Sequence, residues 1–145
     1  MNPVVQQDRT GCGIAAVAAI TGQTYAAVKQ AANTLGIAVS DPRLWTDPEP
    51  IRRLLARFGV AAGAAEAPFR GWPRLPACAL LAIKWHREKT GPAWHWVVFV
   101  RAPDGPVVLD SKRGLRRNRR TDFGRIQPKW FIPIGEPART PPQSD

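Results

Sequence analysis

The sequence predicts an α+β fold in which helices come first and an antiparallel β-sheet follows. Between residues 12 and 59, apolar residues recur at helical spacing and glycines follow each stretch, as in amphipathic helices. From residue 77 onward, short apolar runs lie between proline- and glycine-containing turns, which is typical of strands. With 145 residues, 44% of them hydrophobic, the chain is long enough for one core. We expect one domain over residues 1–134 and a proline-rich, disordered tail over residues 135–145.

Three helices are expected in the first part of the chain. The first begins at Cys12 and ends at Ile20, because its alanines favour helix and the following Thr-Gly pair stops it. The second follows Thr24, a good N-cap, and ends at Gly36. The third follows a Thr-Asp-Pro-Glu cap at residues 46–49 and ends at the next glycine. The apolar stripes of the last two helices consist of Tyr25, Val28, Ala32 and Leu35, and of Ile51, Leu54, Leu55 and Phe58.

An antiparallel hairpin is the clearest strand prediction. Residues 94–101 and residues 107–110 are apolar runs on either side of a Pro-Asp-Gly-Pro turn, so the second run is expected to return alongside the first. The other assignments are a weak strand over residues 60–65, a loop over residues 67–76, a buried strand over residues 77–84 and a last strand over residues 130–134.

The charge of the chain is strongly positive and unevenly distributed. The formal net charge is +10 and the pI is about 11.0, so the protein attracts nucleic acid, anionic membranes or acidic proteins. Much of the excess lies in residues 112–129, which we call the basic segment. The simplest interpretation of this segment is a solvated, mobile loop. Its charged residues are Lys112, Arg113, Arg116, Arg117, Arg119, Arg120, Arg125 and Lys129, opposed by Asp122.

Several classes of protein are disfavoured by the sequence. No apolar stretch has the length of a transmembrane helix, and the amino terminus lacks the basic and apolar regions of a signal peptide. We therefore expect a cytoplasmic protein with no membrane partner, although export by a route without a signal peptide stays open. Cys12 and Cys78 are expected to be free thiols, because a lone disulfide is rare in such a chain.

Two short motifs suggest a cysteine nucleophile and its base. Cys12 lies between glycines at the start of the first helix, where the positive end of the helix dipole favours a thiolate. His95 opens the sequence His-Trp-Val-Val-Phe-Val in the hairpin, and Asp110 ends the returning strand, where it can orient the imidazole. Gln6 and the Cys12 backbone N–H are candidate donors to an oxyanion, since a glutamine amide donates without titrating.

These residues resemble the papain-like cysteine peptidases, most closely the C39-type and C39-like bacterial peptidases, over nearly the whole chain. In that family a glutamine lies six residues before a cysteine in a Cys-Gly-x-Ala context, here Gln6 and Cys12. A His-aromatic-Val-Val strand and a hydrophobic-Asp pair follow, here at His95 and Asp110. The resemblance implies a papain-like fold, a Cys-His-Asp triad and a glutamine donor to the oxyanion hole. It implies a free-standing cysteine peptidase that acts on a peptide or protein and needs no cofactor.

The chain departs from the exporter peptidases at two positions. Those domains usually carry aspartate just before the cysteine and proline just after the orienting aspartate, whereas this chain has Gly11 and Ser111. Cleavage of leader peptides at a double-glycine site is therefore only an analogy. Papain-like amidases, deamidases and acyltransferases, including bacterial effectors, use the same triad, and some papain-like domains only bind. The sequence leaves these alternatives open.

Each candidate also has an interpretation without catalysis. Cys12 and Cys78 are small enough to be core residues, and only Cys12 has the context of a nucleophile. His86 is the one rival base and is expected in a charged surface loop. A metal site formed by these cysteines and the two histidines is disfavoured, because zinc ligands usually come in closely spaced pairs.

Candidate binding residues flank the proposed triad. Trp94 and Trp96 lie beside His95 and are candidates to contact a substrate, although tryptophan is more often a core residue. Arg113 and Arg116 follow Asp110 and favour an acidic substrate or partner. Nucleic-acid binding through residues 112–129 is the alternative from another class, and it is disfavoured because the segment matches no known nucleic-acid-binding motif.

Overall fold

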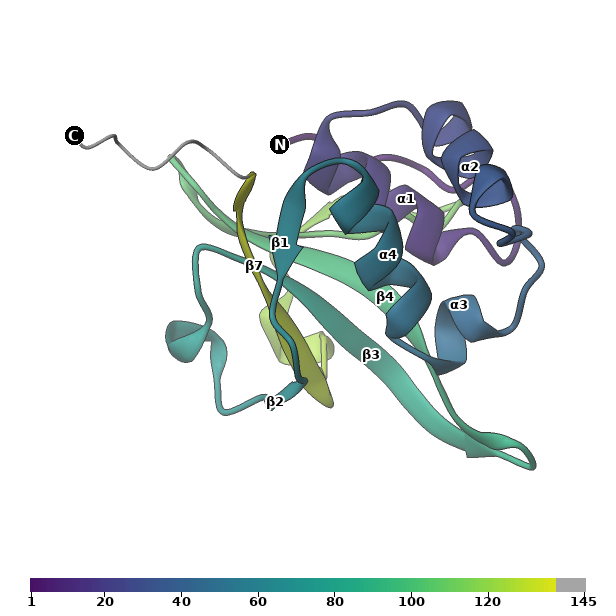
Figure 1. Ribbon diagram of the computed structural model, residues 1–145. Coiled ribbons are helices and arrows are strands. Elements are labelled where there is room, and N and C mark those ends of the chain that lie inside the picture. Colours follow the sequence, from purple (N-terminus) through teal and green to yellow (C-terminus); the bar gives the residue numbers. More distant parts are fainter. Residues whose placement is uncertain (138–145) are drawn as a thin grey trace.

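A computed structural model describes residues 1–137, and it shows helices packed against one face of an antiparallel sheet (Figure 1). This confirms the α+β fold class. The strand order is β1-β7-β3-β4-β5-β6, and β2 pairs with β7. Within the described residues, no helix has both the length and the apolar character needed to span a membrane. The helices are α1 (Cys12–Thr21), α2 (Tyr25–Thr34), α3 (Arg43–Thr46) and α4 (Glu49–Arg57); the strands are β1 (Val60–Ala62), β2 (Ala67–Pro68), β3 (Cys78–Glu88), β4 (Gly91–Ala102), β5 (Gly105–Leu109), β6 (Arg119–Arg120) and β7 (Trp130–Pro137).

The expected helices form with their expected ends. Helix α1 begins at Cys12, and Gly22 adopts a left-handed conformation (φ 71°) at its C-cap, where a side chain would be strained. At the start of α2, the Ala27 N–H donates to Thr24 Oγ1 (3.0 Å), so Thr24 is the N-cap. The short helix α3 was not predicted, because four residues are too few to show helical periodicity.

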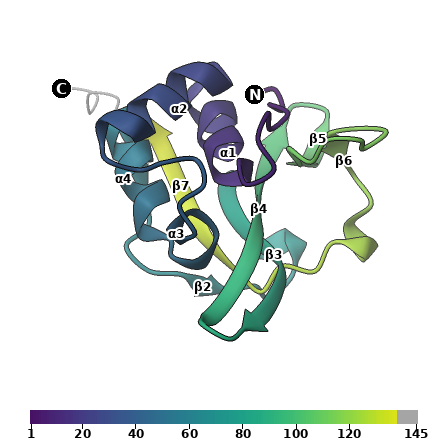
Figure 2. The ribbon, with the colours of Figure 1, turned by 90° about the vertical axis from the view of Figure 1, so that its right-hand side faces the viewer.

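Alternate residues of the strands supply two separate cores. In β3, Leu80 and Ala82 belong to the cluster that contains α1, α2 and α4, whereas Leu81 and Ile83 belong to a cluster on the other face. That second face is covered by residues 69–75 and 123–126, which include two short 3-10 turns. Figure 2 shows β5 and β6 at the edge of the sheet that lies away from α4.

The strands differ from the sequence predictions mainly in length. Strand β3 continues to Glu88, so His86 lies in a strand and not in a loop, and β7 continues to Pro137, into the stretch predicted as a tail. The rest of the predicted tail, residues 138–145, lies outside the described residues. Strands β4 and β5 form the predicted antiparallel hairpin, with Val98 opposite Leu109. Residues 67–76, predicted as a loop, contain the two-residue strand β2 and a 3-10 turn.

A tryptophan fixes α3 to the sheet. Trp96 in β4 is fully buried, and its Nε1–H donates to the carbonyl oxygen of Leu44 in α3 (2.7 Å). Trp94 and Trp130 pack edge-on against it, with ring centroids 5.5 and 5.6 Å away. The Nε1–H of Trp94 is buried but has no hydrogen-bond partner among the described residues. Within the described residues, the indole N–H of Trp96 therefore makes a hydrogen bond and that of Trp94 does not.

We predict that Trp96→Phe lowers the free energy of unfolding by about 2 kcal/mol more than Trp94→Phe, because only the first change leaves a buried carbonyl without its donor. Urea denaturation of both variants at the same pH measures the difference. Equal losses would show that the Trp96–Leu44 hydrogen bond does not stabilise the attachment of α3.

Candidate active site

Cys12 is the first residue of α1 and is 7% exposed. Because it opens the helix, its backbone N–H has no acceptor within the helix and lies at the positive end of the helix dipole. Gly11 lies immediately before it, and a β-carbon on Gly11 would collide with the Tyr25 hydroxyl. The close approach of Tyr25 therefore disfavours any side chain at this position.

His95 and Asp110 meet across the hairpin as the sequence predicted. His95 lies in β4 and Asp110 directly follows β5, and the His95 Nε2–H donates to Asp110 Oδ1 (2.8 Å). The bond at Nε2 leaves Nδ1 unused by Asp110, and the Cys12 thiol lies close enough to His95 to raise the pKa of the imidazole. The three side chains are thus brought together in the order Asp110, His95, Cys12.

Electrostatics in this group favour a charged imidazole. Burial lowers the pKa of His95, but the hydrogen bonds and negative charges of Asp110 and Cys12 outweigh burial and raise it to about 9. Burial by itself raises the pKa of Asp110. The hydrogen bond and charge of His95, together with the hydrogen bonds from Lys112 and Arg120, outweigh burial and lower this pKa to about 2. Near neutral pH the site therefore holds an imidazolium between an aspartate and the cysteine.

Asp110 is 1% exposed, and both of its carboxylate oxygens have donors. The Lys112 backbone N–H also donates to Oδ1 (3.1 Å), and Arg120 Nη1 donates to Oδ2 (3.0 Å). Its backbone is fixed as well, since the Asp110 N–H donates to the Asn118 carbonyl (2.8 Å) and Asn118 Nδ2 donates to the Asp110 carbonyl (2.7 Å). These contacts leave the carboxylate one orientation, directed at His95.

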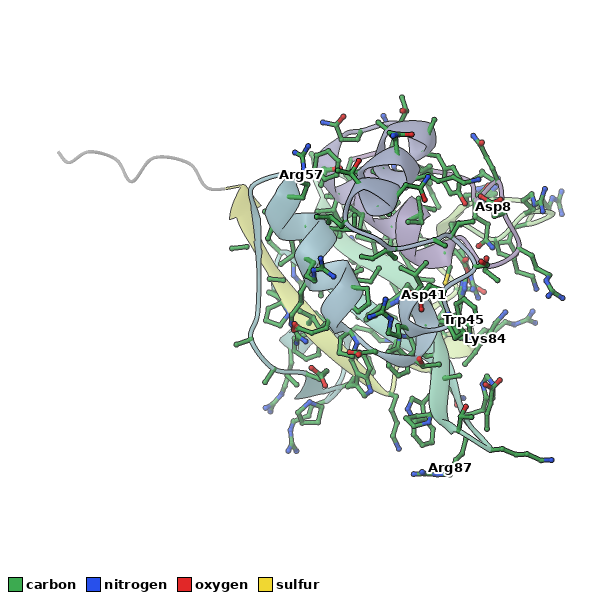
Figure 3. The ribbon with its side chains drawn as sticks, turned by 45° about the vertical axis from the view of Figure 1, so that its right-hand side comes forward. Asp8, Asp41, Trp45, Arg57, Lys84 and Arg87 are labelled. Carbon is green, nitrogen blue, oxygen red and sulfur yellow. The ribbon has the colours of Figure 1, made fainter. Side chains whose placement is uncertain are left out.

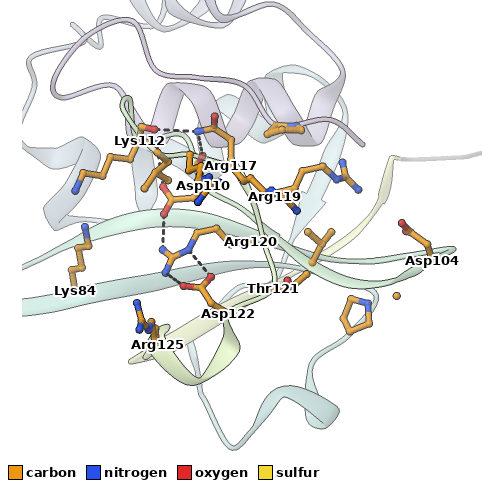
Figure 4. Close-up of a pocket in the computed structure, with 17 residues that line it drawn as sticks. Lys84, Asp104, Asp110, Lys112, Arg117, Arg119, Arg120, Thr121, Asp122 and Arg125 are labelled. Carbon is orange, nitrogen blue, oxygen red and sulfur yellow. Dashed lines mark hydrogen bonds and ion pairs between the residues drawn. The ribbon is translucent and has the colours of Figure 1, made fainter.

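Arg120 is a site residue that the sequence did not reveal. It was counted only as one cation of the basic segment, whereas in the structure its guanidinium lies between Asp110 and Asp122 (Figure 4). Arg120 Nε and Nη2 donate to the two oxygens of Asp122 at 3.0 and 2.8 Å. The signal in the sequence is weak, because the pairing depends on the two-residue strand β6 lying beside β5.

Gln6 differs from its predicted role. Its Nε2 hydrogens are both used within the loop before α1, donated to the carbonyls of Asp8 (3.0 Å) and Arg9 (2.9 Å). Its Oε1 accepts from the Ser111 hydroxyl (2.9 Å), and its backbone N–H donates to the Ser111 carbonyl (2.9 Å). Both amide N–H groups of Gln6, which an oxyanion would need as donors, are thus hydrogen-bonded to loop carbonyls. Gln6 therefore fixes the loop that carries Cys12, and Ser111 supplies a hydroxyl that proline lacks.

Trp94 and Trp96 are core residues, which corrects the prediction that they contact a substrate. Trp96 is fully buried and Trp94 is 6% exposed, so neither ring offers a surface to a ligand. Arg116 is exposed and lines a cavity beside Asp110, while Arg113 is exposed but does not line it. The predicted binding residues are thus divided between core and surface.

The rival cysteine and histidine lie in other environments. Burial raises the pKa of the Cys78 thiol, at the start of β3, to about 11. His86 is exposed, and its ring donates to the Lys84 carbonyl (2.9 Å) and lies 3.1 Å from Glu88 Oε2. Cysteine, histidine, aspartate and glutamate side chains do not form a group of three able to hold a metal ion anywhere in residues 1–137.

Comparisons with known proteins add no family to this geometry. No protein-family model matches the chain, and no curated protein matches it.

We predict that Arg120→Gln lowers the free energy of unfolding at pH 6 by about 3 kcal/mol, because it removes the cation from a buried carboxylate. Asp110 has a lowered pKa in the folded state, so its ion pairs stabilise the protein above pH 3.8 and are lost as the pH falls towards 2. The difference between parent and variant should therefore shrink at pH 2.5. Urea denaturation at both pH values measures it.

The matched control is Asp122→Asn, which removes the more exposed partner of Arg120 and keeps the Arg120–Asp110 pair. We expect this control to cost about 1 kcal/mol or less. If both variants lose the same stability, Arg120 does not act through Asp110.

Proposed function

We propose that this protein is a cysteine peptidase with a papain-like fold, related to the C39-like peptidases, in which Cys12 is the nucleophile. The observation that carries the proposal is the position of His95, which lies between the buried Asp110 and the thiol at the start of α1. The arrangement of elements also supports it. One element presents the cysteine from a helix N-terminus, and the sheet packed against it carries the base and the orienting carboxylate.

The proposed reaction is acyl transfer through the thiol. In the reactive form the proton is on His95, and Cys12 attacks as a thiolate at the carbonyl carbon of a peptide bond to give a tetrahedral oxyanion. His95 then protonates the leaving amine as the C–N bond breaks, which leaves a thioester on Cys12. Water, deprotonated by His95, attacks the thioester and releases the carboxylic acid and the free thiol.

The oxyanion is assigned to the backbone N–H of Cys12, which has no acceptor within α1. Gln6 supports this donor indirectly, because it holds the loop that ends at Cys12. Asp110 keeps Nε2 of His95 as a donor, so that Nδ1 exchanges the proton with the thiol.

We predict that iodoacetamide alkylates Cys12 at pH 6 about 10²-fold faster than Cys78, because the His95 imidazolium lies beside Cys12 while burial raises the pKa of Cys78. Above about pH 9 His95 loses its proton and this electrostatic advantage disappears. Mass spectrometry of the two cysteine peptides, in the parent and in His95→Ala, measures both rates.

Loss of the Cys12 advantage in His95→Ala is the result that supports the proposal. A Cys12 that reacts like Cys78 in the parent, or that is indifferent to His95, would overturn it. Cleavage itself is tested with a quenched-fluorescent peptide library, for which Cys12→Ala, a small change at a buried helix start, should abolish all turnover.

Alkylation by iodoacetamide forms no oxyanion, whereas peptide hydrolysis does. Comparing the two reactions therefore distinguishes a Gln6 that holds the loop from a Gln6 that donates to the oxyanion. We predict that Gln6→Ala lowers the free energy of unfolding by about 2 kcal/mol and slows both alkylation and peptide hydrolysis, since the loop before Cys12 loses its buried hydrogen bonds. The control is Gln7→Ala at the exposed neighbouring residue, which should change neither the free energy of unfolding nor the two reaction rates. If hydrolysis falls while alkylation is unchanged, the Gln6 amide does reach the oxyanion.

A further inference from the structure

A large cavity borders Asp110, the residue that also contacts His95. Its volume is about 1110 Å³, and it is bordered by β5, β6 and most of the basic segment (Figure 4). Asp110 forms part of its wall and shares that wall with Arg120. The cavity therefore shares one residue, Asp110, with the proposed triad.

The wall of this cavity carries an excess of positive charge that the protein itself does not neutralise. Arg120 is paired with Asp110 and Asp122, which leaves Asp104 as the remaining acid of the wall. Within residues 1–137, the other cations of the wall form no salt bridge with a carboxylate. These are Lys84, Lys112, Arg116, Arg117, Arg119 and Arg125.

Lys84 is placed in this wall by a strained backbone. It has φ 53° and is the one non-glycine residue with positive φ in the described part of the chain. The strain coincides with a bulge in β3, where the pairing with β4 shifts between Ile83 and His86. The His86 ring donates to the Lys84 carbonyl (2.9 Å), which helps to hold the bulge. Such strain persists where a side chain must be redirected, and here it directs a lysine to the cavity.

Lys84 and Lys112 converge at the end of the cavity nearest the triad. Figure 4 shows their ammonium groups directed towards one another. Burial and the nearby charge of Lys112 lower the pKa of Lys84, as expected for two cations brought close together. Lys84 also follows Ile83, the residue that pairs with His95 in the sheet. Two like charges held together beside a reactive centre form a site for an anion.

The backbone of the basic segment is held by hydrogen bonds, while most of its side chains are exposed, as expected of a solvated segment. Asn118 closes residues 112–117 into a loop by donating to the carbonyls of Asp110 (2.7 Å) and Lys112 (3.0 Å). The Lys112 backbone is also fixed by the Asp110 carboxylate. A cavity whose backbone is already ordered binds a ligand with a smaller loss of conformational entropy.

The composition of the wall favours a ligand that carries carboxylate groups over one that carries nucleobases. Sites for single-stranded nucleic acid combine cations with aromatic rings on which bases stack, and the wall of this cavity includes no aromatic residue. We propose that the cavity binds a peptide segment rich in aspartate and glutamate, with Lys84 and Lys112 holding the carboxylate closest to the triad. That this peptide is the substrate rests on the proposed peptidase function, whereas the binding does not.

The test measures binding of fluorescein-labelled hexaglutamate to the Cys12→Ala protein by fluorescence anisotropy. We expect saturable binding that weakens with added salt and is about tenfold weaker in Lys84→Gln/Lys112→Gln. The charge-matched control is Arg57→Gln/Arg70→Gln, which removes two cations outside the cavity wall; Figure 3 shows Arg57 on the side of the molecule away from Lys84. The control should weaken binding less than threefold.

Several outcomes would overturn the proposal. Equal weakening by both double variants would mean that only the net charge attracts the peptide. Tighter binding of a thymidine hexanucleotide at the same salt concentration, with the same dependence on Lys84 and Lys112, would assign the cavity to nucleic acid.

A second variant is used if the Lys84 variant does not fold. It is Arg116→Gln/Arg117→Gln, which removes two exposed cations of the wall and should also weaken binding.

The outcome is independent of catalysis, because binding is measured without the Cys12 thiol. If alkylation shows an inactive Cys12 and hexaglutamate still binds through Lys84 and Lys112, the peptidase proposal fails and the binding site stands. If Cys12 is active, glutamate-rich quenched peptides should show a KM about tenfold higher in Lys84→Gln/Lys112→Gln, with kcat little changed.

Discussion

The buried carboxylate of Asp110 is the group on which the rest of the site depends. One oxygen accepts from the His95 ring and the Lys112 backbone, and the other accepts from Arg120. A charge that is 1% exposed persists only when donors replace water around it, and here those donors come from β4, β6 and the basic segment. The same carboxylate thereby orients the imidazole, fixes the start of the basic segment and holds the short strand β6 in place.

A second constraint connects the helical half of the molecule to the sheet. Gln6 accepts a hydrogen bond from Ser111 through its side chain and donates one to Ser111 through its backbone. The segment before α1 is thereby bound to the residue that follows Asp110. The Gln6 amide also holds the turn at residues 8 and 9. Cys12 is thus positioned relative to His95 both by the packing of α1 on β4 and by this polar connection.

The proposed functions of the triad and the cavity share their structural elements. The bulge at Lys84 interrupts the strand that pairs with β4, and the loop closed by Asn118 begins at the residue after Ser111. A change at Asp110 therefore acts on both sites, while changes at Lys84 or Arg116 act on the cavity wall. Much of the excess positive charge of the chain is concentrated in the wall of the cavity that borders Asp110.

The sequence alone determined the α+β class, the ends of α1 and α2, the β4–β5 hairpin and the meeting of His95 with Asp110, because these depend on local periodicity, caps and a tight turn. Tertiary structure decided the rest. Arg120 and Lys84 gain their positions from a two-residue strand and a bulge, which leave no periodic pattern. The Gln6 amide donates to the carbonyls of Asp8 and Arg9, which no sequence pattern indicates, and Trp94 and Trp96 lie in the core because burial depends on residues distant in the chain.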